Sequence, residues 1–288
     1  MHYEGDIIRP PSEAGSIILQ VTVGCSHNAC AFCGAYRSKT FRIKERAVIE
    51  ADIDFAARYC RRQTTLFLAD GNALALPPAE LTDLLRAVSE KLPWVRRVGL
   101  YANARDILGY PPGGLRELRK MGLGRIYMGL ESGHDPTLRI MAKGADAAEM
   151  IRAGRMVREA GIFLSVTVLL GVAGIDHSRE HALATARVLN EMGPSQVAVL
   201  TLMILDNTPL ARRVQTGSFV QPDANGLLGE LATIVEKLDI RCQFQANHAS
   251  NYLSLDGRLP KDKRTFLSSI EEALSGKLTL KPEHCRSL

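Results

Sequence analysis

The sequence predicts an α/β protein, a partial (β/α)6 TIM-like barrel with a short C-terminal extension. Three observations lead to this fold class. Short apolar runs alternate with segments of helical periodicity along most of the 288 residues, which is typical of a parallel sheet with right-handed crossovers. Six such strand–helix units are present, too few for a closed eight-stranded barrel. No Gly-x-Gly-x-x-Gly motif follows the first strand, which disfavours a dinucleotide-binding sheet.

The predicted strands are short and rich in aliphatic and β-branched residues, and they cover residues 17–23, 65–69, 95–102, 125–130, 162–170 and 196–202, with 241–245 as a further candidate. The predicted helices have apolar residues at helical spacing, and glycines follow several of them as normal stops. They cover residues 46–62, 77–91, 113–121, 135–141, 146–160, 178–192, 225–238 and 261–275.

Composition fits one large domain with a mostly aliphatic core, because 46% of residues are apolar and only 6% are aromatic. We expect an N-terminal segment 1–15, a core 16–214 and an extension 215–288 that covers the barrel mouth. The chain has 36 Lys and Arg against 31 Asp and Glu, a net charge of +5. These basic residues are scattered, so a nucleic-acid partner is not indicated.

The first 15 residues lack a basic region followed by an apolar one, so we expect no signal peptide. The longest apolar runs, such as 166–172, are too short to cross a bilayer. These features predict a cytoplasmic protein with no membrane partner. In that compartment the six cysteines are expected to be metal ligands or free thiols and not disulfides.

Three cysteines, Cys25, Cys30 and Cys33, follow the first predicted strand with the spacing CxxxxCxxC. Ligand sites in parallel α/β sheets lie at the carboxyl ends of the strands, and both iron–sulfur clusters and zinc take thiolate ligands. A structural zinc site needs four ligands, so His27 would have to fold back onto the same metal. A [4Fe–4S] cluster with one open iron is therefore favoured, and a zinc-stabilised α/β binding protein is the alternative.

The segment QVTVGCSHNACAFCGAY resembles the cluster loop of the radical S-adenosylmethionine (SAM) superfamily. Residues 129–133 (GLESG) and 141–144 (MAKG) are similar to the subgroup of oxygen-independent coproporphyrinogen oxidase and the Elongator catalytic subunit, and GVAG at 171–174 also fits. Two departures stand out: one extra residue separates Cys25 from Cys30, and the second strand is followed by Asp70-Gly71-Asn72 where the family usually has GGE.

This resemblance implies a [4Fe–4S] cluster and SAM as cofactors. It also implies reductive cleavage of SAM to a 5′-deoxyadenosyl radical that abstracts hydrogen from an unidentified substrate, small or macromolecular. An electron donor such as flavodoxin or ferredoxin is the expected partner. A non-catalytic or electron-transfer iron–sulfur protein using the same cysteines is a second alternative, although it does not explain the motifs after the later strands.

The resemblance also suggests roles for individual residues, each with a plainer structural alternative. Asp70, Gly71 and Asn72 are expected to hold the SAM ammonium group, or else to form an ordinary turn. Glu131 is expected to bind the SAM ribose or amine, with a helix-capping pair formed with Ser132 as the alternative. The remaining candidates for SAM binding are Phe32 against the adenine, Lys143 at the carboxylate, and Asn103, Ser132 and Ser165. Their structural alternatives are a core position for Phe32, core or cap positions for Asn103 and Ser165, and the solvated surface for Lys143.

A polar segment, residues 244–252, lies in the C-terminal extension. We expect it to form a lid in which Asn247, His248 and Asn251 touch the substrate, although such residues also form ordinary turns. The cysteines outside the loop are too dispersed to form a second cluster: Cys60, Cys242 and Cys285.

Overall fold

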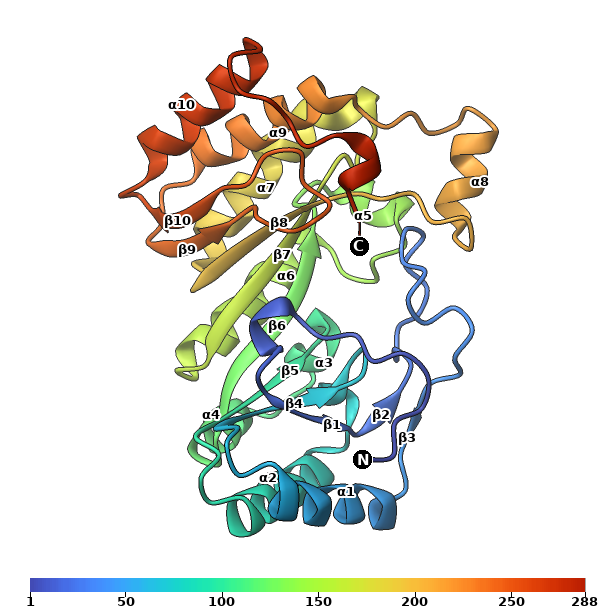
Figure 1. Ribbon diagram of the computed structural model, residues 1–288, viewed down its shortest axis with the longest axis vertical. Coiled ribbons are helices and arrows are strands. Elements are labelled where there is room, and N and C mark those ends of the chain that lie inside the picture. The colour runs from blue at the N-terminus through green and yellow to red at the C-terminus, as the bar shows by residue number, and fades with distance from the viewer. Residues whose placement is uncertain (288) are drawn as a thin grey trace. The chain divides into compact units, whose positions relative to one another are not determined.

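The computed structural model describes residues 1–287, which form an eight-stranded, mostly parallel sheet with helices along it (Figure 1). The strand order is β1-β4-β5-β6-β7-β8-β9-β10, an open sheet within the described residues. The predicted partial-barrel α/β class is confirmed. The strands are β1 (Ile17–Gln20), β4 (Thr65–Ala69), β5 (Arg97–Tyr101), β6 (Leu123–Glu131), β7 (Phe163–Leu170), β8 (Gln196–Thr201), β9 (Cys242–Gln245) and β10 (Asp256–Leu259).

Two compact units make up the chain, and they interleave in sequence. Unit 1 consists of Met1–Asn28, Ala35–Met128 and Met156–Leu164, and unit 2 consists of Ala29–Gly34, Gly129–Arg155 and Ser165–Leu288. The three contiguous segments expected from the sequence therefore do not coincide with these units, and they stay a prediction.

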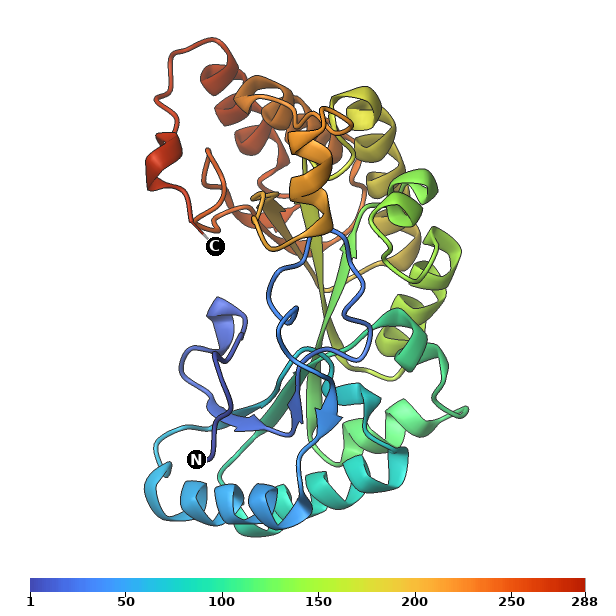
Figure 2. The same cartoon turned by 90° about the vertical axis from the view of Figure 1, so that its right-hand side faces the viewer.

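Unit 1 is built on β1, β4 and β5, which pair in parallel with Ile17 opposite Leu66 and Leu66 opposite Val98. Residues 66–69 of β4 are completely buried, as expected of a parallel strand covered on both faces. Helices α1 (Arg46–Tyr59) and α2 (Pro78–Lys91) pack side by side, and α1 also packs against β1 (Figures 1 and 2). The short helices of this unit are α3 (Ala104–Leu108) and α4 (Gly114–Lys120).

The first predicted strand, 17–23, is wrong in one respect, because it is two strands. After β1 the chain turns away at Val21, and β2 (Thr22–Val23) pairs antiparallel with β3 (Arg42–Ile43) in a separate small sheet. Apolar periodicity along the chain does not reveal this break, because the partner strand is two residues long and lies far away in sequence.

Unit 2 contains the parallel pairs β7–β8, with Ser165 opposite Gln196, and β8–β9, with Gln196 opposite Gln243. Strand β10 closes this edge antiparallel to β9. Helices α7 (Ser178–Met192), α9 (Ala224–Lys237) and α10 (Lys263–Leu274) pack in succession, with α9 in orange beside α10 in red (Figures 1 and 2). The other helices are α5 (Asp135–Ile140), α6 (Ala147–Glu159), whose residues from Met156 onward belong to unit 1, and α8 (Pro209–Gln215).

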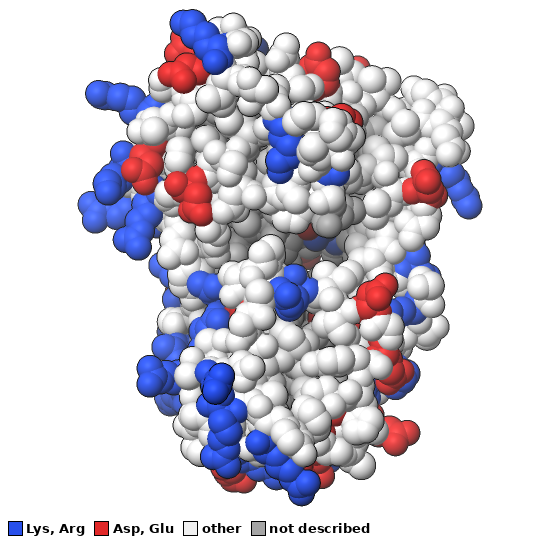
Figure 3. Space-filling model, viewed as in Figure 1, with Lys and Arg blue, Asp and Glu red and all other residues white. Residues whose placement is uncertain are grey.

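The surface charges are mixed in sign on the face drawn in Figure 3, where acidic side chains lie beside many of the basic ones. Within residues 1–287, no helix is both long enough and apolar enough to cross a bilayer.

Candidate functional site

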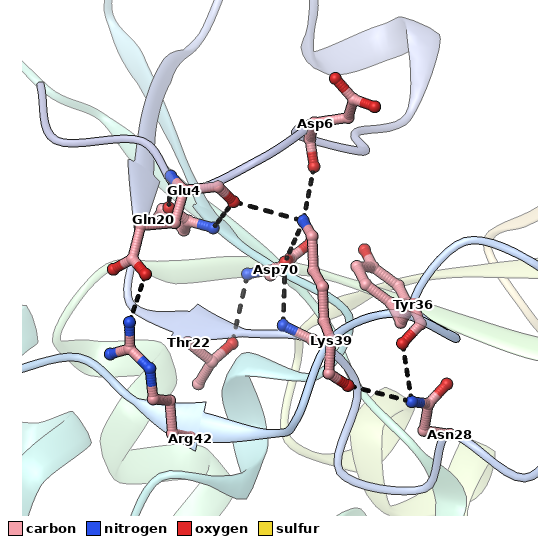
Figure 4. Close-up of polar contacts among 10 residues, drawn as sticks. Glu4, Asp6, Gln20, Thr22, Asn28, Tyr36, Lys39, Arg42 and Asp70 are labelled. Carbon is pink, nitrogen blue, oxygen red and sulfur yellow. Dashed lines mark hydrogen bonds and ion pairs between the residues drawn. The ribbon is translucent and has the colours of Figure 1, made fainter.

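Asp70 lies directly after β4 and reaches back to the start of the cysteine loop (Figure 4). Its Oδ2 atom accepts a hydrogen bond from the Gly24 backbone N–H at 3.1 Å and lies 3.5 Å from Lys39 Nζ. The side chain is completely buried, and a buried carboxylate is costly unless it is paired. Lys39 supplies the opposite charge, so Asp70 ties the turn after β4 to the loop.

Two side chains that no sequence pattern singles out, Asn28 and Lys39, hold the part of the loop that returns toward β3. Lys39 Nζ donates to the carbonyl oxygens of Asp6 at 2.9 Å and Glu4 at 3.3 Å (Figure 4). Asn28 Nδ2 donates to the carbonyl oxygens of Tyr36 at 2.8 Å and Lys39 at 3.3 Å. Asn28 has φ +32°, a conformation that asparagine tolerates better than most residues. These bonds fix the loop to the N-terminal segment.

Gly71 lies against Cys25. Its N–H donates to the Gly24 carbonyl oxygen at 3.2 Å, and a Cβ atom at position 71 would come within 2.7 Å of the Cys25 Cβ and 2.8 Å of Tyr36 Cε2. Only glycine allows this approach. The segment expected to follow the second strand therefore touches the first cysteine of the loop.

Asn72 is completely buried next to it. Its Nδ2 group donates to Ser26 Oγ at 2.6 Å and to Asp106 Oδ2 at 2.5 Å. Its Oδ1 atom and the Asp70 Oδ1 atom have no hydrogen-bond partner among the described residues, and neither does the hydroxyl of Tyr36, which lies beside Asp70. Buried oxygens in native proteins nearly always have one, and an ammonium group offers three donors. The two oxygens that flank Gly71 therefore fit the predicted amine-binding role.

Ser26 and Asp106 were not among the predicted residues, and they connect Asn72 to its surroundings. The predicted Asn103 lies at the start of α3 with its Nδ2 atom 3.5 Å from Ser26 Oγ. A polar residue directly after a strand or inside a short helix is too common for the sequence alone to have selected Ser26 or Asp106.

Tyr36 is a further residue that sequence reasoning missed. Burial raises its pKa far above the ordinary value, and the neighbouring Asp70 carboxylate adds to the rise. Its phenol therefore stays protonated over the physiological range and presents a neutral hydroxyl beside Asp70.

The second half of the loop, Ala29–Gly34, belongs to unit 2. Ala31 N–H donates to the Met141 carbonyl at 2.8 Å, and Leu210 N–H donates to the Ala31 carbonyl at 3.0 Å. Phe32 is partly buried and packs on an apolar cluster. The buried members of that cluster are Ala31, Met141, Leu169, Val172, Leu202, Leu210 and Phe219. Cys30 and Cys33 therefore lie on a turn that is held from two sides.

Cys25, Cys30 and Cys33 are all partly exposed, and none of the six cysteines forms a disulfide bond. Among residues 1–287, no group of three or more His, Cys, Asp or Glu side chains is arranged to hold a metal ion. The donor set fits an iron–sulfur cluster in its chemistry, because such clusters are bound by thiolates. The backbone hydrogen bonds of Ala31 restrain the turn that carries Cys30 and Cys33. The contact with Gly71 restrains Cys25.

Glu131 ends β6 with φ +64° and folds its side chain back over Gly129. A Cβ atom on Gly129 would lie 2.1 Å from Glu131 Oε1 and 2.9 Å from Lys143 Nζ. Glu131 Oε1 and Lys143 Nζ form an ion pair at 3.0 Å, with side chains that are 12% and 11% exposed. The structure thus brings together two of the predicted SAM-binding residues.

Ser132 and Ser165 are both buried. Ser132 Oγ accepts the His134 N–H at 3.0 Å and lies 2.8 Å from His181 Nδ1 on α7. Ser165 lies within β7 opposite Gln196. SAM binding by these two residues stays a prediction.

The predicted lid is anchored to β8. Asn251 is buried, its Oδ1 accepts the Thr201 hydroxyl at 2.8 Å, and its Nδ2 donates to the Val199 carbonyl at 2.8 Å. Asn247 is exposed and donates to Asp256 Oδ2 at 2.8 Å. His248 Nδ1 accepts the Ser250 N–H at 3.1 Å, and burial lowers the pKa of its ring. These bonds give the segment a defined position, while its contact with a substrate stays a prediction.

Comparison with known proteins gives a family and a fold. A family model described as the radical SAM superfamily matches residues 19–208. An uncharacterized protein of Methanocaldococcus jannaschii is 28% identical over 138 residues, which are 48% of this chain and 38% of that protein.

Solved structures with a similar fold include two at 16% and 12% sequence identity. Coproporphyrinogen III oxidase from Escherichia coli has 16% identity and a TM-score of 0.58, and the match covers 77% of this chain and 51% of that one. The archaeal Elp3 protein of Methanocaldococcus infernus has 12% identity and a TM-score of 0.54, with 91% and 63% covered. The chain thus spans less than two thirds of each of these relatives.

Proposed function

The chain belongs to the radical SAM superfamily, and on that premise we propose that it binds a [4Fe–4S] cluster through Cys25, Cys30 and Cys33 and cleaves SAM reductively. The resemblance of the cysteine loop to this family is confirmed, and the similar folds include both members of the subgroup suggested by the later motifs. The predicted cofactors are confirmed at the level of the family, whose enzymes use a [4Fe–4S] cluster and SAM.

The observation that carries the proposal is the contact of the turn after β4 with the first cysteine. Gly71 touches Cys25, and the flanking Asp70 and Asn72 each have one buried oxygen without a partner. An amine bound here would lie beside a cluster-binding thiolate and receive two acceptors. When bound, the cluster and SAM together supply a 5′-deoxyadenosyl radical that abstracts hydrogen from a substrate.

The chain's own residues position and shield this chemistry. Asp70 and Asn72 orient the amine, and Ser26 and Lys39 keep those two side chains in place. In unit 2, the Glu131–Lys143 pair offers a carboxylate and an ammonium to the polar groups of SAM. Phe32 and the apolar cluster beneath it exclude water. The substrate is unidentified, and a flavodoxin or ferredoxin is the proposed electron donor.

The test is anaerobic reconstitution of the full chain with iron and sulfide, followed by reduction in the presence of SAM. The protein should be brown, and 5′-deoxyadenosine should accumulate. Cys30→Ala should abolish both properties, while Cys285→Ala, at an exposed cysteine outside the loop, should leave both unchanged. A colourless protein that retains zinc would contradict the proposal, and so would a brown protein that yields no more 5′-deoxyadenosine than Cys30→Ala.

A further inference from the structure

Three buried polar side chains from separate elements of unit 2 form a line: Ser132 after β6, His181 on α7 and Glu230 on α9. Ser132 Oγ lies 2.8 Å from His181 Nδ1, and His181 Nε2 lies 3.8 Å from Glu230 Oε2. Ser132 and His181 are 0% exposed and Glu230 is 2% exposed. Since no substrate reaches a hydroxyl buried in this way, Ser132 is not a nucleophile. The three side chains instead bind other parts of the protein.

The outer ends of this line are two loops at the carboxyl ends of strands. Ser132 is the neighbour of Glu131, and its Oγ accepts the His134 N–H. Glu230 Oε2 accepts the N–H of Gly171, the residue directly after β7, at 2.7 Å. Glu230 lies beyond residues 19–208, the part of the chain that the family model matches. Glu230, which is outside the matched region, therefore binds the loop after β7 directly and the loop after β6 through His181, and both loops are inside that region.

The hydrogen bonds around the ring favour one placement of its proton. Burial lowers the pKa of His181 to about 3, so its ring is neutral and carries one proton. Two hydroxyl groups face His181 Nδ1, Ser132 Oγ at 2.8 Å and Thr185 Oγ1 at 3.3 Å. Each of them already accepts a backbone N–H and has its own proton to donate, so we assign Nδ1 as the acceptor. An Nδ1 atom that accepts requires the proton to be on Nε2, facing the Glu230 carboxylate.

Two atoms at the gap between His181 and Glu230 support this placement of the proton. His181 Nε2 and Glu230 Oε1 are both buried and without a hydrogen-bond partner among the described residues. The 3.8 Å separation of Nε2 from Oε2 is too long for a direct hydrogen bond. A small closure, or one water between the two groups, satisfies both with Nε2–H as the donor.

We propose that Glu230, acting through His181 and Ser132, is a positioning residue for the loops after β6 and β7, and that it sets the orientation of Glu131 toward SAM. This inference rests on the proposed function for its role in SAM binding. Its structural part, that the ring proton of His181 is on Nε2 and faces Glu230, does not rest on the proposed function.

Glu230→Gln keeps the size of the side chain and removes its charge. Oε2 is both the acceptor of the Gly171 N–H and the atom nearest His181 Nε2, so the Gln oxygen takes that position and still faces the ring as an acceptor. Nitrogen–proton NMR correlation of the histidine rings in the full chain, at about pH 8.5 so that Glu230 is ionised, should show the Nε2–H form in the wild type and in the variant, with the Nε2–H proton shifted upfield in the variant because its acceptor is neutral. An Nδ1–H form in the wild type overturns the proposal even if the variant does not fold.

The second readout is the KM for SAM in 5′-deoxyadenosine formation. Glu230→Gln should raise it by about three- to tenfold, the effect of weakening one charge-assisted hydrogen bond to a neutral one, with a smaller change in kcat. Glu236→Gln, an exposed carboxyl on the same helix, should leave KM unchanged. A wild type that forms no 5′-deoxyadenosine refutes the proposed function. The NMR result then still shows which nitrogen of His181 carries the proton. An active wild type whose KM is unaffected by Glu230→Gln overturns the positioning role.

Discussion

Glu131 Oε1 and Lys143 Nζ lie 3.0 Å apart, and the two side chains fold together over the bare Cα of Gly129. The pair is nearly excluded from solvent, so each charge depends on the other for compensation. Gly129 and Glu131 are two residues apart in a single strand and point to the same face. The Gly-x-Glu pattern therefore has a physical reason: the glycine provides the space that the carboxylate occupies.

Gly129→Ala tests this relationship. The new methyl group would meet Glu131 Oε1 at 2.1 Å, so the ion pair must move, and overpacking of this kind costs about 1–3 kcal/mol. We expect the free energy of unfolding in urea to fall by that amount and SAM to bind more weakly in equilibrium dialysis. Gly229→Ala is the control, because nothing lies within 4 Å of its added Cβ and alanine is the better helix former. If Gly129→Ala is as stable as the wild type, the Glu131–Lys143 pair can move aside without cost, and the glycine is not required for space.

Gly71→Ala should reduce cluster binding. The added Cβ would lie 2.7 Å from the Cys25 Cβ and 3.0 Å from its Cα, so the first cysteine must be displaced. We expect less than half of the wild-type iron and sulfide per chain after reconstitution, measured by colorimetric assay. Gly15→Ala, which meets nothing within 4 Å, should bind the wild-type amount. A full complement of iron in Gly71→Ala would mean that the loop is not held by this turn.

The sequence was sufficient to predict the strands after which these residues lie. Every predicted strand except the first matches the structure to within two residues, because long apolar runs have few alternatives in a parallel sheet. Cys25, Asp70 and Glu131 were selected because each follows a predicted strand, and their roles at the cofactors stay predictions. Strand β10, with the sequence DGRL, has no such pattern and is specified only by its pairing with β9.

Lys39, Ser26 and Asp106 could not be predicted, because their roles depend on the path by which the loop returns. For Glu230, in contrast, the sequence carries a recognisable signal. Glu230 stands among Leu227, Leu231 and Ile234 on the buried face of α9. A carboxyl group on the apolar face of a helix is rarely accidental, because burying it without a partner is costly.

Lys39→Met should destabilise the protein through Asp70. Removing one partner of a buried ion pair leaves the other charge uncompensated, and Lys39 also donates to two carbonyl groups of the N-terminal segment. We expect a loss of about 2–4 kcal/mol in urea unfolding. Lys39→Met combined with Asp70→Asn should recover part of this loss, because the second change removes the orphaned charge. If the double variant is as unstable as the sum of the single variants, the two side chains are not coupled.

Glu230 should make the stability of the protein depend on pH near neutrality. Burial raises the pKa of its carboxyl group from 4.5 to about 7. Between these values the folded chain keeps a proton that the unfolded chain has released, so this contribution is fully present below pH 4.5 and is lost as the pH rises through 7. The rise corresponds to roughly 3 kcal/mol. His181 has the opposite sign: its pKa falls from 6.5 to about 3, so its contribution is present above pH 6.5 and is lost as the pH falls.

Glu230→Gln separates the two effects, because His181 and its neighbour His134 remain in both proteins, as do the other charged residues that line the hollow beside Glu230: Asp176, Arg179 and Glu180. The stability of the variant relative to the wild type should therefore rise between pH 4.5 and 7 and level off above that range. Urea unfolding at a series of pH values measures this difference, with Glu236→Gln as the control, which should track the wild type throughout. A constant offset between Glu230→Gln and the wild type would show that the Glu230 carboxyl titrates normally and that its burial carries no linked proton.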